Sequence, residues 1–240
     1  MNFWSIIISG LSLGSIYALI ALGYTMVYGI ARMLNFAHGD IIMVGAFTVI
    51  VAITSMGINP LVACVLSVLT CILFGIIIEK IAYKPLRKAP PLTILITAIG
   101  VSYFLQSLAL IIFGSNQRNF PNIPFINVSP VTMGSIMIRG ESISTLGIAL
   151  ITMCLLTVFI QKTKIGKAMR AVSEDKEAAE LMGISVDKTI TITFAIGSGL
   201  AALAGIFFGS TYGFIGAYTG SMPGIKAFVA AVFGGIGSIP

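Results

Sequence analysis

The chain has 240 residues, of which 57% are hydrophobic and only 9% are charged, and its mean hydropathy is +1.04. Soluble domains carry about 25% charged residues, so this composition excludes an ordinary water-soluble domain and predicts an all-α protein that crosses the membrane several times. The net charge of +6 does not indicate nucleic-acid binding, because the basic residues lie in short runs between apolar segments, as they do in cytoplasmic loops.

Apolar stretches long enough to cross the hydrocarbon core, which takes roughly 20 helical residues, recur along the whole chain. The first has no Lys or Arg before it, unlike a secretory signal, so we interpret it as a retained span. Its four glycines would allow a break within it. We expect a single membrane domain over 1–240 with spans near 3–30, 41–56, 60–82, 91–113, 145–161 and 190–210, and an incomplete seventh over 225–240.

An interruption follows the first span. The stretch "MLNFAHGDIIMVGAF", residues 33–47, contains the only histidine of the chain and an aspartate two places later. An unpaired Asp at the centre of the bilayer costs about 3 kcal/mol on insertion scales. Such a carboxylate must therefore be paired, capped or close to water. The candidate residues are Asn35, His38, Gly39 and Asp40.

Three interpretations of this interruption remain open. In the first it is a turn at the inner membrane surface, where Asp40 caps the following helix and Arg32 reaches the interface. In the second it is a broken helix whose free amides face a translocation path. The third is a proton relay through His38 and Asp40.

The basic clusters set the orientation. "EKIAYKPLRK" follows the third span and "QKTKIGKAMR" follows the fifth, so both can face the cytoplasm, and the N-terminus then lies outside. The polar loop 114–144 falls on the outer face and could dock an external partner. Its segment "SIMIRGESIS" alternates apolar residues around Arg139 and Gly140, which predicts a small hairpin there.

The inner loop 162–189 is predicted to contain a short amphipathic helix over 173–183. Such a helix is marginal in water, so it is either a connector lying on the membrane or a docking helix for a cytoplasmic partner. Ser173 would be its N-cap, and Glu174, Asp175 and Glu177 lie in its first turns, where the helix dipole favours acids. Ala178, Leu181 and Met182 would form its apolar face, and Gly183 would be the left-handed residue that ends it.

Two further features follow. "GSGLAALAGIFFGS", residues 197–210, places small residues at steps of four, which predicts close helix packing within the subunit or across a dimer. In "YTGSMPGIKAF", residues 218–228, Pro223 and Gly224 break the helical pattern, with Lys226 in apolar surroundings. This is either a second break on the path or a simple loop.

The residues of an enzyme or a metal site are missing from the sequence. The three cysteines lie inside apolar runs and form no CxxC or Cys/His cluster, there is one histidine, and no HExxH or nucleophile–base arrangement is present. No GxxxxGK[ST] loop for nucleotide phosphates is present either. We therefore expect a chain that is not an enzyme and binds neither metal nor cofactor.

Several stretches resemble one known family. The run "GKAMRAVSEDKEAAELMGISVDKTITITFAIGSGLAALAG" (166–205) looks like the coupling loop and following span of branched-chain amino acid ABC transporter permeases of the LivH type. "GLSLGSIYALIALGYTMVYGI" (10–30), "LNFAHGD" (34–40) and "EKIAYKPLR" (79–87) resemble the same family. The likeness extends over nearly the whole chain. Members usually continue beyond "AAVFGGIGSIP", so we expect C-terminal spans to be missing.

The resemblance implies a bundle similar to type II ABC importer permeases in the bacterial cytoplasmic (inner) membrane. It also implies a second permease subunit, an external solute-binding protein and two cytoplasmic ATPases that hold ATP and Mg. Helix 173–183 would then be the coupling helix. The implied cargo is leucine, isoleucine or valine, although permeases for urea and short amides are similar. A self-sufficient channel or secondary carrier is the alternative outside this class, but a channel has no use for a docking helix.

Overall fold

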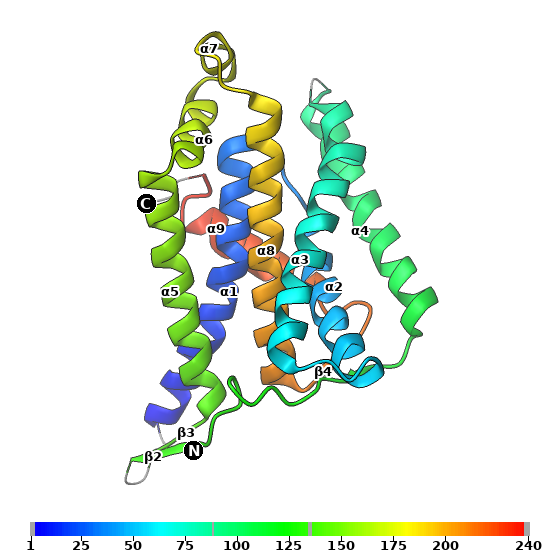
Figure 1. Ribbon diagram of the computed structural model, residues 1–240, viewed down its shortest axis with the longest axis vertical. Coiled ribbons are helices and arrows are strands. Elements are labelled where there is room, and N and C mark those ends of the chain that lie inside the picture. Colours follow the sequence, from blue (N-terminus) through cyan, green and yellow to red (C-terminus); the bar gives the residue numbers. More distant parts are fainter. Residues whose placement is uncertain (1–2, 88, 134–135, 238–240) are drawn as a thin grey trace.

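Helices form most of the computed structural model, which describes residues 3–87, 89–133 and 136–237 (Figure 1). Among these residues, six helical segments are long and apolar enough to cross a membrane. The expectation of an all-α membrane bundle is therefore confirmed. The helices of these six segments are α1 (Phe3–Ala31), α2 (His38–Ile50), α3 (Pro60–Ile78), α4 (Pro91–Phe113), α5 (Gly140–Lys162) and α8 (Val186–Tyr212), and α2 reaches the length of a span only with the turn that follows it, to Ser55.

The remaining elements are short. Three are helices: α6 (Lys164–Glu174), α7 (Lys176–Leu181) and α9 (Ser221–Phe233). Helix α2 continues as a π-helical turn (Val51–Ser55), and α3 continues as a second one (Glu79–Tyr83) and a 3-10 turn (Lys84–Leu86). The strands are β1 (Arg118–Asn119), β2 (Val131–Met133), β3 (Ile136–Ile138) and β4 (Phe214–Ile215).

The helices differ from the predicted spans mainly at their ends. Helix α4 begins and ends at the predicted residues, and α1 runs unbroken through its four glycines. Helices α2 and α5 begin earlier than expected, at His38 and Gly140. The last stretch forms α9, whose 13 residues are fewer than a span requires.

Helix α8 is the centre of the bundle, and α1, α2 and α3 pack around it. The small residues predicted to allow close packing do so within this chain. A Cβ on Gly205 would collide with the carbonyl oxygen of Ile42, and one on Gly197 would lie 3.2 Å from a methyl of Val27. Because side chains are absent at these points, the backbone of α2 approaches α8 directly.

The loop between α4 and α5 takes part in two small antiparallel pairs, the second of them with β4 after α8. Strand β2 pairs with β3, Val131 opposite Ile138 and Met133 opposite Ile136, while β1 pairs with β4. The hairpin therefore lies before the predicted position, because Gly140 is the first residue of α5 and continues into its helix. Apolar alternation showed that a hairpin was present but did not locate its turn.

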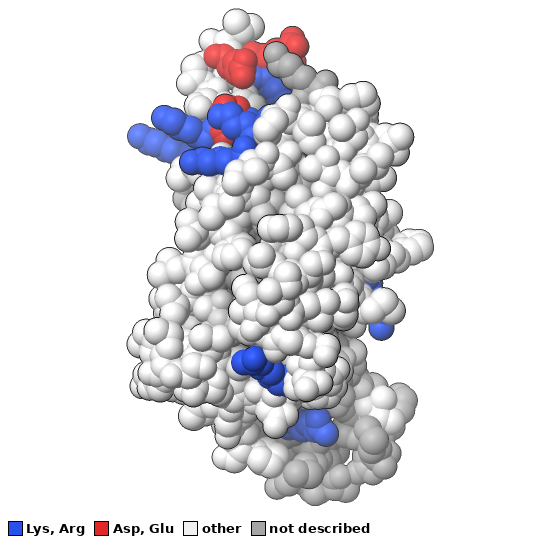
Figure 2. Space-filling view, turned by 90° about the vertical axis from the view of Figure 1, so that its right-hand side faces the viewer, with Lys and Arg blue, Asp and Glu red and all other residues white. Residues whose placement is uncertain are grey.

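The two ends of the bundle differ (Figure 1). One carries α6, α7 and the connection from α3 to α4, and is called the α7 end. The opposite hairpin end carries the β2–β3 pair and the start of α1. Figure 2 shows acidic side chains at the tip of the α7 end with basic side chains directly beneath them on this face.

Candidate functional site

The interruption after α1 lies inside the bundle. Arg32 leaves α1 in a left-handed conformation with φ of 59°, and residues 33–37 form no helix. His38, 1% exposed, then packs against Gly23 in α1, where a Cβ would collide with its imidazole. Gly23 lies eight residues before the end of α1, or about 12 Å at 1.5 Å per residue. Helix α2 therefore begins at depth, which favours the broken-helix interpretation over a turn at the surface.

Asp40 does not cap α2. The helix begins at His38, its N-cap is Ala37, and no side chain bonds to its first amides. Asp40 is the third residue of the helix and 1% exposed, and its Oδ1 accepts a hydrogen bond of 2.9 Å from Nε2 of Gln106 in α4. The predicted cap was wrong because the helix starts three residues earlier than the apolar run suggests.

Gln106 is the centre of a buried polar cluster. Its Nε2 lies 2.9 Å from Asp40 Oδ1, 3.0 Å from Ser102 Oγ and 3.1 Å from Ser221 Oγ. These side chains come from α2, α4 and α9, so the cluster joins three helices at the point where α2 and α9 begin. Gln106, Ser102 and Ser221 were not expected from the sequence. A glutamine and a serine four residues apart in an apolar helix were the available signal.

The starts of α2 and α9 cross in close contact. A Cβ on Gly39 would lie 2.6 Å from the carbonyl oxygen of Gly220, and 3.3 Å from the Cα of Gly224. Pro223 and Gly224 lie in the first turn of α9, where proline is tolerated because its missing N–H has no helical partner. They belong to the start of a helix and do not break one, and Gly224 lies beside Gly39.

Asn35 and His38 lie on the other side of the interruption. Asn35 accepts a 2.9 Å hydrogen bond from the Tyr83 hydroxyl, and the His38 ring lies 4.7 Å from that of Tyr24. Neither His38 ring nitrogen has a partner in hydrogen-bond geometry among the described residues. No hydrogen bond is recorded between His38 and Asp40, so the described contacts provide no proton relay between them.

Two cavities flank this region. The first, of about 360 Å³, is lined by side chains from α1, the interruption after it, α4, the turn before α9 and α9 itself. They are Tyr24, Phe36, Ile99, Ser102, Tyr103, Gln106, Tyr218, Ser221 and Ile225. We call it the polar cavity, because the amide and hydroxyls of the buried cluster face it.

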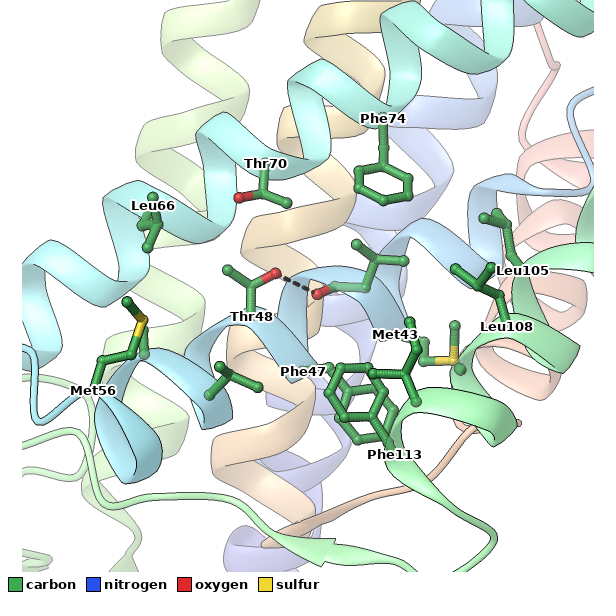
Figure 3. A pocket seen from close by; sticks show the side chains of 15 residues that line it. Met43, Phe47, Thr48, Met56, Leu66, Thr70, Phe74, Leu105, Leu108 and Phe113 are labelled. Carbon is green, nitrogen blue, oxygen red and sulfur yellow. Dashed lines mark hydrogen bonds between the residues drawn. The ribbon is translucent and has the colours of Figure 1, made fainter.

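The second cavity, of about 260 Å³, lies between α2, α3 and α4 (Figure 3). Apolar side chains dominate its lining, among them the rings of Phe47 and Phe113, stacked 4.1 Å apart. The hydroxyl of Thr48 donates to the Val44 carbonyl at 2.8 Å and is not free. This apolar cavity suits a hydrocarbon group and not a charged solute.

The predicted helix 173–183 is shorter than expected. Ser173 and Glu174 belong to the end of α6, and Asp175 is the N-cap of α7, accepting from the amides of Glu177 and Ala178 at 2.9 and 3.1 Å. Ser173 is not the cap, because its hydroxyl donates to the carbonyl of Arg170. Gly183 has φ of 81°, the predicted left-handed terminator.

The apolar face of this segment is not used by the chain itself. Leu181 is 89% exposed and Met182 is 83% exposed, and Ala178 is exposed as well. Ala179, which was not predicted to face inward, is the buried residue of α7. An acidic helix of this kind, with two large bare apolar side chains beside it, offers a surface for another protein.

Two hydrogen bonds connect this segment to the end of α1. The Arg32 guanidinium donates to the Ser173 carbonyl at 3.0 Å, and the Lys176 ammonium donates to the Ala31 carbonyl at 2.9 Å. Burial is the main cause that lowers the pKa of Lys176, and the charges of Arg87 and Arg32 lower it further. Residues 31–32 directly precede the interruption, so α7 and the buried cluster are linked through six residues of chain, 32–37.

An ion-pair cluster fixes the α7 end. Arg87 donates to both Glu79 and Asp187, and Lys84 lies 2.8 Å from Asp187. Glu79 is fully buried and also accepts from the Thr191 hydroxyl at 2.8 Å. These contacts tie the end of α3 to the start of α8. The basic run 79–87 predicted a membrane boundary, but not that its charges pair with α8.

The comparisons with known proteins agree on one family. The model of the "branched-chain amino acid transport system / permease component" family matches residues 6–240. The LivH permease proteins of Escherichia coli K12 and Salmonella typhimurium are 44% and 43% identical to the chain, each match covering 97% of it and 79% of the relative. The BraD permease protein of Pseudomonas aeruginosa is 41% identical, covering 98% and 80%. No solved structure matches the chain.

Proposed function

Because the chain belongs to the family of branched-chain amino acid transport permeases, we propose that it is the membrane-spanning subunit of an ATP-driven importer of leucine, isoleucine and valine. In this proposal the chain catalyses no reaction and binds no cofactor. Two cytoplasmic ATPases hold ATP and Mg, a second permease subunit completes the membrane part, and an external solute-binding protein delivers the amino acid.

The exposed α7 segment is the observation that carries this proposal. A self-sufficient channel or carrier gains nothing from a capped acidic helix with Leu181 and Met182 in water. A motor protein would cover both side chains in a groove, which is how amphipathic helices commonly bind partners. Burial of a Leu or Met side chain contributes about 1.5–3 kcal/mol.

The proposed mechanism is alternating access. Closure of the ATPase dimer on nucleotide moves α7, and the hydrogen bonds from Lys176 and Arg32 transmit that movement to the end of α1. Residues 32–37 then shift the start of α2, which packs against the start of α9. The broken helices would thereby open the path alternately to the two sides of the membrane.

The proposed location is the bacterial inner membrane, with the α7 end in the cytoplasm and the N-terminus outside. The basic residues near α3 and α6 support this orientation. Lys226 supports a path beside α9, because its side chain is exposed on this apolar helix and takes part in none of the ion pairs among the described residues. A lysine facing lipid there would be costly, whereas one facing a second subunit or a water-filled path is not.

Reconstitution of the full complex tests the role of α7. We expect the double variant Leu181→Ser, Met182→Ser to fold normally but to lose co-purification with the ATPases and ATP-dependent leucine uptake into liposomes. Glu174→Lys with Glu177→Lys should uncouple the complex in the same assay. The matched control is Phe125→Ser with Val128→Ser, two exposed apolar residues at the hairpin end. Normal coupling in both α7 variants would refute this function.

The alternative cargo is urea or a short amide. Competition distinguishes the two, because excess unlabelled valine should abolish uptake of labelled leucine, whereas excess urea should leave it unchanged. Uptake that follows urea and ignores valine would favour the alternative.

A further inference from the structure

The polar cavity contains hydrogen-bonding groups that the protein does not satisfy itself. The Gln106 amide has two N–H groups but three oxygens within 3.1 Å of its Nε2, so one of them goes without that donor. For Gln106 Oε1, no partner is recorded among the described residues, although the side chain is only 7% exposed. Because Gln106 lines the cavity, this oxygen can accept a hydrogen bond from a ligand there.

The charge next to the polar cavity is negative. Asp40 lies directly behind Gln106, and none of the ion pairs among the described residues involves it. Its negative charge favours a cation in the cavity, and Gln106 Oε1 accepts hydrogen bonds. An ammonium group satisfies both requirements.

Other groups of the cavity lining favour an anion. The hydroxyls of Ser102 and Ser221 can donate, and Ser221 begins α9, whose first amides carry the positive end of the helix dipole. Phe36, Ile99 and Ile225 form apolar walls between these polar groups. The cavity volume of about 360 Å³ lies at the lower end of the range of roughly 300–1,000 Å³ for small-molecule sites.

We infer that the polar cavity is the contact site for the amino acid in transit. Its ammonium binds at Gln106 under the charge of Asp40, its carboxylate at Ser221 and the start of α9, and its aliphatic side chain against Phe36, Ile99 and Ile225. This inference rests on the proposed function and deepens it, since it gives the permease its own selection of the solute. The groups that touch the amino acid directly are an uncharged amide and uncharged hydroxyls, which suits a site that must also release its ligand.

Variants of the cluster test the inference in the complete transporter reconstituted in liposomes. We expect Gln106→Leu to lower the rate of leucine uptake at saturating loaded binding protein at least roughly tenfold, a factor equivalent to about 1.4 kcal/mol. Ser221→Ala should lower it several-fold and change the ratio of leucine to alanine uptake. Both variants should co-purify with the ATPases at the wild-type yield.

Thr70→Ala is the matched control, because it removes one hydroxyl from the lining of the apolar cavity (Figure 3). It should leave the uptake rate and the selectivity unchanged. If Gln106→Leu fails to assemble, the uptake rate and selectivity of Ser221→Ala test the inference, because this variant leaves the bond between Gln106 and Asp40 in place.

A photoreactive leucine carrying a diazirine provides a test without any variant. In the wild-type complex arrested during turnover with vanadate, crosslinks should map to Phe36, Ile99 or Ile225. Crosslinks elsewhere, or unchanged uptake and selectivity in Gln106→Leu and Ser221→Ala, would overturn the inference. If the wild-type complex instead imports no leucine with ATP, the proposed function itself fails.

Discussion

Gly220 and Gly39 lie where α2 and α9 meet, and the close contact there leaves no room for a side chain. A Cβ on Gly220 would collide with the carbonyl oxygen of Gly39, and a backbone group cannot turn aside as a flexible side chain can. Because overpacking costs about 1–3 kcal/mol, we expect Gly220→Ala to lower the thermal midpoint of the purified protein clearly. Differential scanning fluorimetry in detergent measures it.

Gly100 is the control for this substitution. It lies within α4, and a Cβ there would meet no atom within 4 Å. Gly100→Ala should raise the midpoint, since Ala stabilises a helix interior by roughly 0.5–1 kcal/mol relative to Gly. Similar shifts in the two variants would contradict the close crossing of α2 and α9.

Arg87 is a second residue on which the stability of the fold depends strongly. Its removal leaves the fully buried Glu79 carboxylate without a cation, so Arg87→Met should destabilise by about 3–5 kcal/mol. Lys84→Met, which breaks a half-exposed pair, should cost only about 0–1 kcal/mol. Denaturant unfolding measures both. Adding Glu79→Gln to Arg87→Met should restore part of the stability. A double variant less stable than Arg87→Met alone would disprove the ion pair between Arg87 and Glu79.

At the scale of elements, α7 and the end of α1 are expected to move as one unit. Lys176→Met removes the hydrogen bond to the Ala31 carbonyl but keeps the aliphatic part of the side chain. We expect the variant to hydrolyse ATP in the reconstituted complex while importing several-fold fewer leucine molecules per ATP. Lys167→Met on the exposed face of α6 is the control. An unchanged ratio of leucine to ATP in Lys176→Met would exclude this link from the coupling.

The sequence predicted elements better than contacts. Hydropathy located the helices, and the bounds of α4 were correct, because long apolar runs and Pro91 leave little choice. The start of α2 was misplaced because His38, Gly39 and Asp40 look like a loop, and only the neighbouring helices make them helical. Asp175 competed with Ser173 for the cap of α7, since both are good capping residues. The bond from Gln106 to Asp40, and the contact of Gln106 with Ser221, could not be predicted, because these residues lie far apart in sequence.

At the scale of the whole molecule, the proposed orientation in the membrane rests on where the charges lie. Leu181 at the α7 end and Phe125 at the hairpin end are both exposed. We expect Phe125→Cys to react with a membrane-impermeant maleimide on intact cells, and Leu181→Cys to react only in inverted vesicles. The unsubstituted chain, with its three free cysteines, gives the background. The opposite pattern would invert the orientation and place α7 out of reach of any cytoplasmic ATPase.

Helix α4 packs mainly on α2 and on the π-helical turn after α3, and it leans away from the remaining helices (Figure 1). It nevertheless supplies Gln106 and much of one wall of the polar cavity. The volume of the polar cavity thus depends on the position of one peripheral helix, which begins at Pro91, shortly after the Arg87 ion pairs. If the amino acid binds in the polar cavity as we infer, a lipid or neighbouring subunit that presses on α4 should narrow the space available to it.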